Sequence, residues 1–92
     1  DLLTVVDKQG SLIGIVTNGD LKRTVKKNVD LYTENVKELV HYYPYFVDVS
    51  SMAIDALKIM EENKVHSIPV VKEEKPIGVI EKRDIIKAGI YL

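Results

Sequence analysis

Two acid-containing pairs with the same spacing are the residues best suited to chemistry in this sequence. Thr17 precedes Asp20 by three residues, and Glu81 precedes Asp84 by three. Each pair follows an apolar run and should begin a helix, where a threonine and a carboxylate at this spacing make a capping box. The same groups can bind a ligand, because unpaired amides attract a phosphate and a carboxylate accepts hydrogen bonds from hydroxyls. The residues alone leave both roles open for Thr17 and Asp20.

Other kinds of site find little support in the composition. His41 and His66 are the only histidines and there is no cysteine, so we expect no metal site. No nucleophile stands beside a base in a recognisable turn, which predicts that these residues are not an enzyme by themselves. Thirteen basic against fourteen acidic residues predict no nucleic-acid binding.

The length of the apolar runs and the first residues bear on location. No apolar run approaches the ~20 residues that span a bilayer, so we expect no membrane segment. The chain opens at Asp1 with no signal-peptide pattern, and the lack of cysteine fits a reducing compartment. We therefore expect a piece of a longer cytoplasmic protein.

The sequence contains an internal repeat. Val5 and Val6 match Val70 and Val71 at an offset of 65 residues, whereas the later matches have an offset of 64, as listed here: Ile13 with Ile77, Gly14 with Gly78, and Asp20 with Asp84. Both copies predict a strand, a polar turn, a second strand and a helix. The strands are expected at 4–7, 12–16, 68–71 and 77–80. The first helix should follow Thr17, with Leu21 and Val25 facing inward. The second helix is expected over 82–88 and should end at Gly89.

The segment between the copies should form three more elements. Asn35 and Glu38 predict a capping box and a short helix ending near His41. A short strand is expected over 46–49, followed by a helix capped by Ser50 or Ser51. The aromatic run over 41–46 is expected to pack a turn onto the core, with base stacking by its tyrosines as the alternative.

This order of elements resembles the CBS domain, the cystathionine β-synthase-type module that occurs in tandem and often binds adenine nucleotides. The match rests on residues 14–20 (GIVTNGD), residues 78–84 (GVIEKRD) and residues 67–71 (SIPVV). The resemblance implies an α+β fold of tandem motifs, each running strand, helix, strand, strand, helix. It implies that 1–34 hold the C-terminal part of the first motif plus a linker, without the motif's initial strand and helix, and that 35–92 hold the second motif.

The resemblance also implies which residues bind a nucleotide. In this family the signature aspartate accepts hydrogen bonds from a ribose, the threonine bonds a phosphate or ribose, and backbone segments enclose the base. Carried onto this sequence, the implied nucleotide-binding residues are Thr17, Asn18, Asp20, Val47, His66, Ile68, Pro69 and Asp84. Glu81 departs from the pattern, since a carboxylate repels a phosphate and caps a helix less well than threonine.

The closing residues 83–90 look most like the C-terminal part of arabinose 5-phosphate isomerases. That likeness implies a regulatory module behind an N-terminal sugar-isomerase domain, with no required cofactor and with AMP, ATP or a CMP-sugar acid as ligand. It also implies a homodimer formed through the CBS motifs. The alternatives are a structural dimerisation module and the CBS tail of a sugar nucleotidyltransferase.

Overall fold

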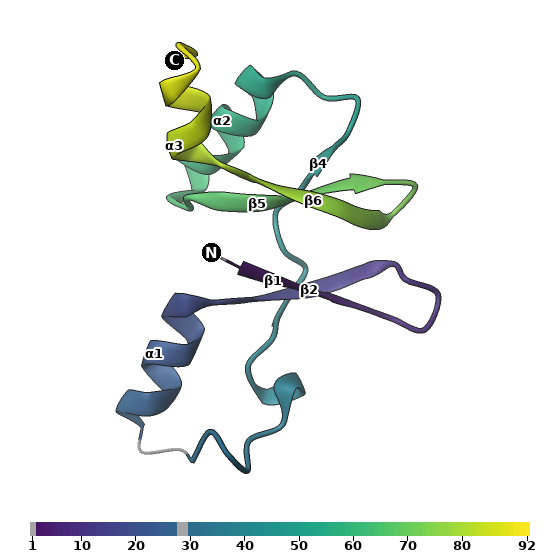
Figure 1. Cartoon of the computed structure of the whole chain (residues 1–92), viewed down its shortest axis with the longest axis vertical. Helices are drawn as coiled ribbons and strands as arrows, with labels where there is room; N and C mark the ends of the chain where they lie inside the picture. Colours follow the sequence, from purple (N-terminus) through teal and green to yellow (C-terminus); the bar gives the residue numbers. More distant parts are fainter. Residues whose placement is uncertain (1, 28–29) are drawn as a thin grey trace.

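The computed structural model describes residues 2–27 and 30–92 and shows two strand hairpins, each followed by a helix (Figure 1). Both hairpins send their helices to the same side of the molecule, on the left in Figure 1, and their turns to the other side. The elements in chain order are β1 (Leu2–Val6), β2 (Leu12–Thr17), α1 (Asn18–Lys26), η1 (Val36–Glu38), β3 (His41–Tyr42), β4 (Val47–Asp48), α2 (Ala53–Asn63), β5 (Ser67–Lys72), β6 (Lys75–Glu81) and α3 (Lys82–Lys87).

The strands form two three-stranded sheets. In the first, the order is β1-β2-β3 and both pairings are antiparallel. In the second, the order is β4-β5-β6, with β4 parallel to β5 and β6 antiparallel to it. The expected α+β class is therefore confirmed, and the predicted hairpins and helices of both copies are present.

Equivalent irregularities in the two hairpins confirm the internal repeat. The register of β1 against β2 shifts between Val5 and Val6, and that of β5 against β6 shifts between Val70 and Val71. A bulge of this kind bends a strand and increases its twist. Because the bulge occurs at the same aligned position in both copies, the sequence repeat corresponds to a repeated backbone structure.

The core belongs to the second repeat. Its buried members come from β4, α2, β5 and α3, and are Val47, Ala56, Leu57, Met60, Ile68 and Ile85. Apolar residues at helical spacing on α2 supply one layer, and alternate residues of β5 supply the facing layer. The predicted inward stripe of α1 holds only in part, because Leu21 is half-buried but Val25 is 54% exposed.

The segment between the repeats departs from the predictions in three places. The helix expected from Asn35 to near His41 is one 3-10 turn, and His41 begins the unexpected strand β3. The Asn35 side chain does accept a hydrogen bond from the Lys37 amide, as a cap should. Helix α2 begins after Met52 and has no side-chain cap, because the Ser50 hydroxyl instead donates to Asp48.

Candidate functional site

The Thr17–Asp20 pair at the start of α1 forms the capping box that its spacing predicts. Oγ1 of Thr17 accepts a hydrogen bond from the Asp20 amide at 3.3 Å. Oδ2 of Asp20 accepts in return from the Thr17 amide at 2.7 Å and from the Thr17 hydroxyl at 2.9 Å. Thr17 has extended backbone angles, so the chain turns from β2 directly into the helix.

The other carboxylate oxygen of Asp20 is occupied as well. Arg23 donates to Oδ1 of Asp20 from Nη2 at 2.6 Å, and Nε2 of His41 contacts the same oxygen. His41 reaches this point because β3 pairs with β2, opposite Ile15. Asp20 is only 6% exposed, whereas Arg23 and His41 are well exposed. Each oxygen of this buried carboxylate thus has partners from the protein.

These contacts determine the ionisation of Asp20. Burial disfavours the charged carboxylate and acts to raise its pKa, but the hydrogen bonds from Thr17 and Arg23 and the charge of His41 lower the pKa below its ordinary value. The net direction is downward. Asp20 is therefore an anion held between cationic and hydrogen-bonding groups.

The equivalent position at the start of α3 is built differently. Glu81 precedes the helix but makes no side-chain cap, as its residue type predicted, and its carboxylate lies 3.1 Å from Nε of Arg83. Asp84 is exposed, and no hydrogen bond or ion pair joins its carboxylate to the residues that the structure describes. The Lys82 amide donates to the carbonyl of His66 at 2.8 Å, which fixes the helix start beside β5.

A cavity of about 520 Å³ opens beside this helix start. Its lining consists of His66, Glu81, Lys82, Arg83 and Ile86. Asp84 lies between Arg83 and Ile86 in the chain but is not part of the lining. Lys82 also pairs with Glu61 of α2, at 2.6 Å. The cavity therefore carries two cationic side chains, each neutralised in part by a glutamate.

Three of the expected ligand-enclosing residues are core residues. Val47 and Ile68 are buried in the hydrophobic cluster, and Pro69 is fully buried beside them. Their side chains therefore hold the second repeat together. That the backbone of these residues encloses a base stays a prediction. Asn18 and His66 are exposed at the two helix starts.

Sequence reasoning missed the two partners of Asp20 outside the capping box. Arg23 carries a recognisable signal, because a basic residue three positions after an acidic one lies on the same helix face. His41 carries none, since it lies twenty-one residues along the chain and meets Asp20 only through the pairing of β3 with β2.

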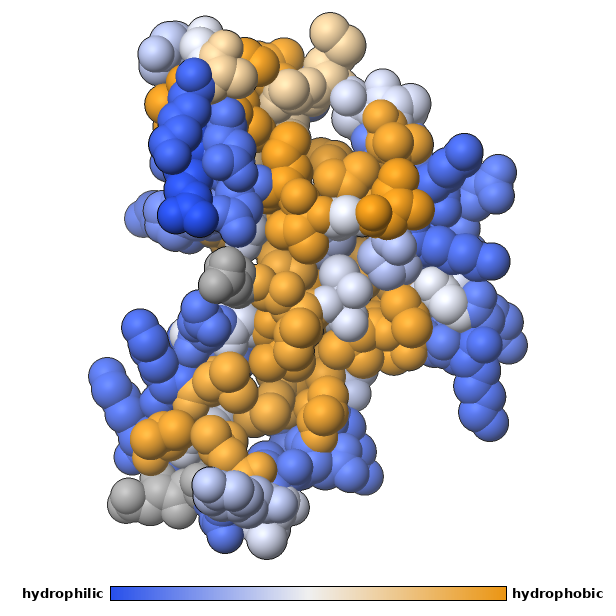
Figure 2. Space-filling model, viewed as in Figure 1, coloured by the Kyte–Doolittle hydropathy of each residue, from blue (hydrophilic) through white to orange (hydrophobic). Residues whose placement is uncertain are grey.

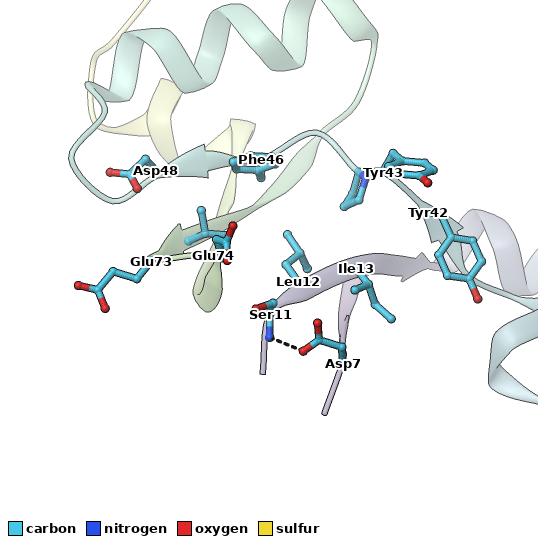
Figure 3. Close-up of a pocket in the computed structure, with 12 residues that line it drawn as sticks. Asp7, Ser11, Leu12, Ile13, Tyr42, Tyr43, Phe46, Asp48, Glu73 and Glu74 are labelled. Atoms are coloured by element: carbon cyan, nitrogen blue, oxygen red, sulfur yellow. Dashed lines mark hydrogen bonds between the residues drawn. The ribbon is translucent and has the colours of Figure 1, made fainter. Parts of the chain in front are cut away.

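The aromatic run lines a second and larger cavity, of about 1010 Å³, on the side of the hairpin turns. Figure 3 shows Tyr42, Tyr43 and Phe46 from the segment between the repeats together with Ile13 of β2 and Glu74 of the second turn. Tyr43 is 97% exposed and Phe46 is 51% exposed, so the prediction that this run packs onto the core is wrong. The run crosses between the two sheets, where the described chain has no layer to cover it.

Residues 2–27 and 30–92 contain no group of three or more histidine, cysteine or acidic residues placed to hold a metal ion. Within the same ranges no helix is both long enough and apolar enough to cross a membrane.

Known proteins resemble this chain in sequence and in fold. The arabinose 5-phosphate isomerase KdsD of Pseudomonas aeruginosa is 32% identical over 90 residues, which cover 97% of this chain and 28% of the enzyme. A signal-transduction protein with CBS domains from Burkholderia ambifaria superposes with a TM-score of 0.82 at 29% identity, covering 97% of this chain and 65% of that one.

A third relative was solved with a ligand. CBSX2 in complex with AMP superposes with a TM-score of 0.74 at 27% identity, covering 96% of this chain and 69% of that chain. The present chain thus spans little more than a quarter of the length of the isomerase that it matches. A family model described as the CBS domain matches residues 36–91, and the chain belongs to the CBS domain family.

Proposed function

We propose that the chain is the regulatory, nucleotide-sensing CBS module of a larger sugar-phosphate isomerase, with its repeats divided at residues 34 and 35. Two likenesses support this proposal. The 32% identity with arabinose 5-phosphate isomerase extends over nearly the whole chain. CBSX2, at 27% identity, was solved in complex with AMP, which makes an adenine nucleotide the first ligand to try.

The observation that carries the proposal is the free carboxylate of Asp84. It stands in the first turn of α3, exposed to solvent, beside a cavity that Lys82 and Arg83 line. A carboxylate accepts hydrogen bonds from the paired hydroxyls of a ribose, and basic side chains attract a phosphate. The backbone of residues 66–69 and Val47 would enclose the base, and Glu81 is restrained from repelling the phosphate by its pairing with Arg83.

The first repeat has polar groups of the same kind, but its signature carboxylate is already bound by protein partners. Thr17, Asn18 and Asp20 stand at the start of α1, but both oxygens of Asp20 already have protein partners. A ribose at Asp20 must displace Arg23 or His41, and that displacement costs binding free energy. We therefore expect the first ligand to bind beside Asp84.

Regulation requires that the ligand bind one arrangement of the module better than another. In the proposed parent protein, which interconverts ribulose 5-phosphate and arabinose 5-phosphate, a downstream CMP-sugar acid is a second candidate ligand. Its phosphate and sugar hydroxyls would use the same groups as AMP. The sign of the effect on the isomerase follows from which arrangement the ligand favours.

Calorimetry on the longer protein, with AMP, ATP and a CMP-sugar acid added separately, tests the proposal. We expect Asp84→Asn to weaken binding at least tenfold, because a ribose loses a charged acceptor. Asp55→Asn is the matched control, since Asp55 is also exposed and occupies the same position in the first turn of α2. Absence of binding for all three ligands at millimolar concentration would refute the sensing role.

The isomerase assignment needs its own measurement. The longer protein should convert ribulose 5-phosphate to arabinose 5-phosphate, and the bound ligand should change that rate in the parent but not in Asp84→Asn. Conversion without any ligand effect would leave the module a structural role. Failure to convert the sugar phosphate while AMP still binds would place the module behind a different enzyme.

A further inference from the structure

The larger cavity, here named the turn-side cavity, is bounded by both repeats and by the segment that joins them. Its lining comes from the first hairpin turn and β2, from residues 42–46, and from β4, β5 and the second hairpin turn. The Leu12 amide donates to the Glu74 carbonyl at 2.8 Å, so a backbone hydrogen bond joins the two turns. The cavity therefore has one wall from each repeat, held together, around about 1010 Å³.

Aromatic side chains line this cavity without being covered by the described chain. Tyr43 is 97% exposed, and Tyr42 and Phe46 are 52% and 51% exposed. On the face that Figure 2 shows, apolar side chains run through the middle of the molecule and charged side chains gather on the turn side. Exposed apolar groups rimmed by charge mark interaction sites, and tyrosine is enriched among the residues that dominate binding.

Every charged residue that lines the turn-side cavity is acidic, and these residues are Asp7, Asp48, Glu73 and Glu74. Lys8, Lys72 and Lys75 are close to them in the chain, but none of the three lines the cavity. Among the described residues, no ion pair joins these lysines to the four carboxylates. The cavity therefore has a negative potential that a cationic group would neutralise.

These carboxylates keep acceptor capacity for a ligand. Asp7 uses one oxygen for two amides of its own turn, and Asp48 uses one oxygen for Ser50. No hydrogen bond from the described residues reaches the second oxygen of either aspartate or the carboxylates of Glu73 and Glu74. Arginine and lysine side chains are the donors that match such free carboxylate oxygens.

The aromatic rings and most of the carboxylates lie in different parts of the cavity. In Figure 3, Asp48, Glu73 and Glu74 lie at one end, whereas Tyr42 and Tyr43 lie at the other. A ligand that matches the whole cavity must therefore carry positive charge at one end and an apolar group at the other.

We propose that the turn-side cavity binds a segment of a partner protein that is basic at one end and apolar at the other. An arginine or lysine of that segment would pair with the carboxylates of Glu73 and Glu74, and an apolar side chain would pack on Tyr42 and Tyr43. Sites for small molecules enclose most of the ligand surface. Because Tyr43 is almost fully exposed, the lining favours a chain segment that stays partly in water over an enclosed small molecule.

The position of the cavity separates this site from the proposed nucleotide site. The helix starts that carry Asp20 and Asp84 face one side of the molecule, and the hairpin turns face the other (Figure 1). A partner segment at the turns would leave both helix starts accessible. The module would then offer one surface to a nucleotide and a second surface to a protein.

Selection from a display library of random peptides, with the longer protein as the target, tests the proposal. We expect the peptides that bind the parent but not Glu73→Asn/Glu74→Gly to be enriched in arginine or lysine next to apolar residues. The two substitutions suit the left-handed backbone at these positions, so the variant keeps the fold. A library that yields no such peptide, or peptides without an excess of basic residues, would overturn the proposal.

Calorimetry with one selected peptide measures what each part of the cavity contributes. Glu73→Asn/Glu74→Gly should weaken binding at least tenfold and reduce its dependence on salt, because two partner charges are lost. Tyr43→Ala should weaken binding several-fold through lost contact area. The control Asp55→Asn/Glu62→Gln also removes two exposed negative charges, but from α2, and should leave the Kd unchanged. Equal weakening in the control would show that net charge alone attracts the peptide, which contradicts the proposal.

A small organic cation is the other chemistry that this lining would accept, and benzyltrimethylammonium is the probe for it. It carries a cation and an aromatic ring, but it fills only part of a cavity of about 1010 Å³. We expect it to compete with the selected peptide only at far higher concentration. Tighter binding than that of the peptide would refute a protein partner. None of these measurements requires a nucleotide, so they are independent of ligand sensing.

Discussion

Arg23 and Asp20 lie three residues apart on α1, and their Nη2 and Oδ1 atoms are 2.6 Å apart. The same oxygen contacts His41, so one buried carboxylate ties the start of α1 to the strand that leaves for the second sheet. A surface ion pair contributes little to stability. This one differs because the carboxylate is buried and its second oxygen is held by the capping box.

The first prediction concerns stability in acid. The pKa of Asp20 is lower in the folded chain than its ordinary value, so unfolding at low pH takes up protons. The free energy of unfolding therefore decreases as the pH is lowered. The contribution is complete above the unfolded pKa of about 3.9 and is lost as the pH falls through the folded pKa below it. Urea titrations between pH 5 and pH 2.5 measure the free energy of unfolding. As the pH is lowered, that free energy should decrease less steeply for Asp20→Asn than for the parent.

Asp48 supplies the control for that measurement. Hydrogen bonds from Ser50 lower its pKa as well, so some acid sensitivity should persist in Asp20→Asn. The double variant with Asp48→Asn should be flatter than either single variant. Parallel curves for the parent and Asp20→Asn would show that the contacts of Asp20 do not stabilise its charge.

The second prediction is that Glu81→Thr stabilises the protein. Glu81 occupies the cap position of α3 without a side-chain hydrogen bond, whereas Thr17 makes one at the equivalent position. A good cap contributes about 1 kcal/mol, and the exposed pair that Glu81 makes with Arg83 is worth less. Thermal unfolding should show a higher Tm for Glu81→Thr and a lower one for Thr17→Ala. A lower Tm for Glu81→Thr would mean that the Arg83 pair matters more than the cap.

The third prediction concerns the turn between β5 and β6. Glu73 and Glu74 have φ of 51° and 70°, the left-handed region that favours asparagine and glycine. A side chain there costs about 1–2 kcal/mol per residue. Glu73→Asn combined with Glu74→Gly should therefore raise the free energy of unfolding by about 1–2 kcal/mol in a urea titration. The pair Lys72→Asn and Lys75→Gly, flanking the turn, should give no such gain.

The fourth prediction compares the two repeats at one aligned position. Ile68 is 1% exposed in the core, whereas its equivalent Leu3 is 68% exposed. Ile68→Ala should cost about 2–5 kcal/mol through lost burial and a cavity. Leu3→Ala should change the stability of a protein of these 92 residues by less than about 0.5 kcal/mol. Equal losses at both positions would mean that Leu3 is covered in solution.

Local patterns in the sequence were sufficient for the hairpins, the helices and the capping box. The Thr17–Asp20 spacing predicts hydrogen bonds that close within one turn of α1, and the aligned valines predict two hairpins of one design. Such features depend on neighbours within a few residues, so periodicity and residue type reveal them. The departure at Glu81 likewise predicted a poorer helix cap than threonine makes, and the Glu81 side chain makes no cap hydrogen bond.

Contacts between distant segments were decided by the tertiary structure alone. The two residues of β3 have no periodic pattern, and they form a strand because β2 offers them a free edge at Gly14. That pairing brings His41 onto Asp20, whereas Asp84, the counterpart of Asp20 in the second repeat, is exposed. The aromatic run is exposed for the same reason, since its surroundings depend on where two sheets meet. The sequence thus determined the repeated unit, and the packing of the units determined which signature carboxylate is buried and which is exposed.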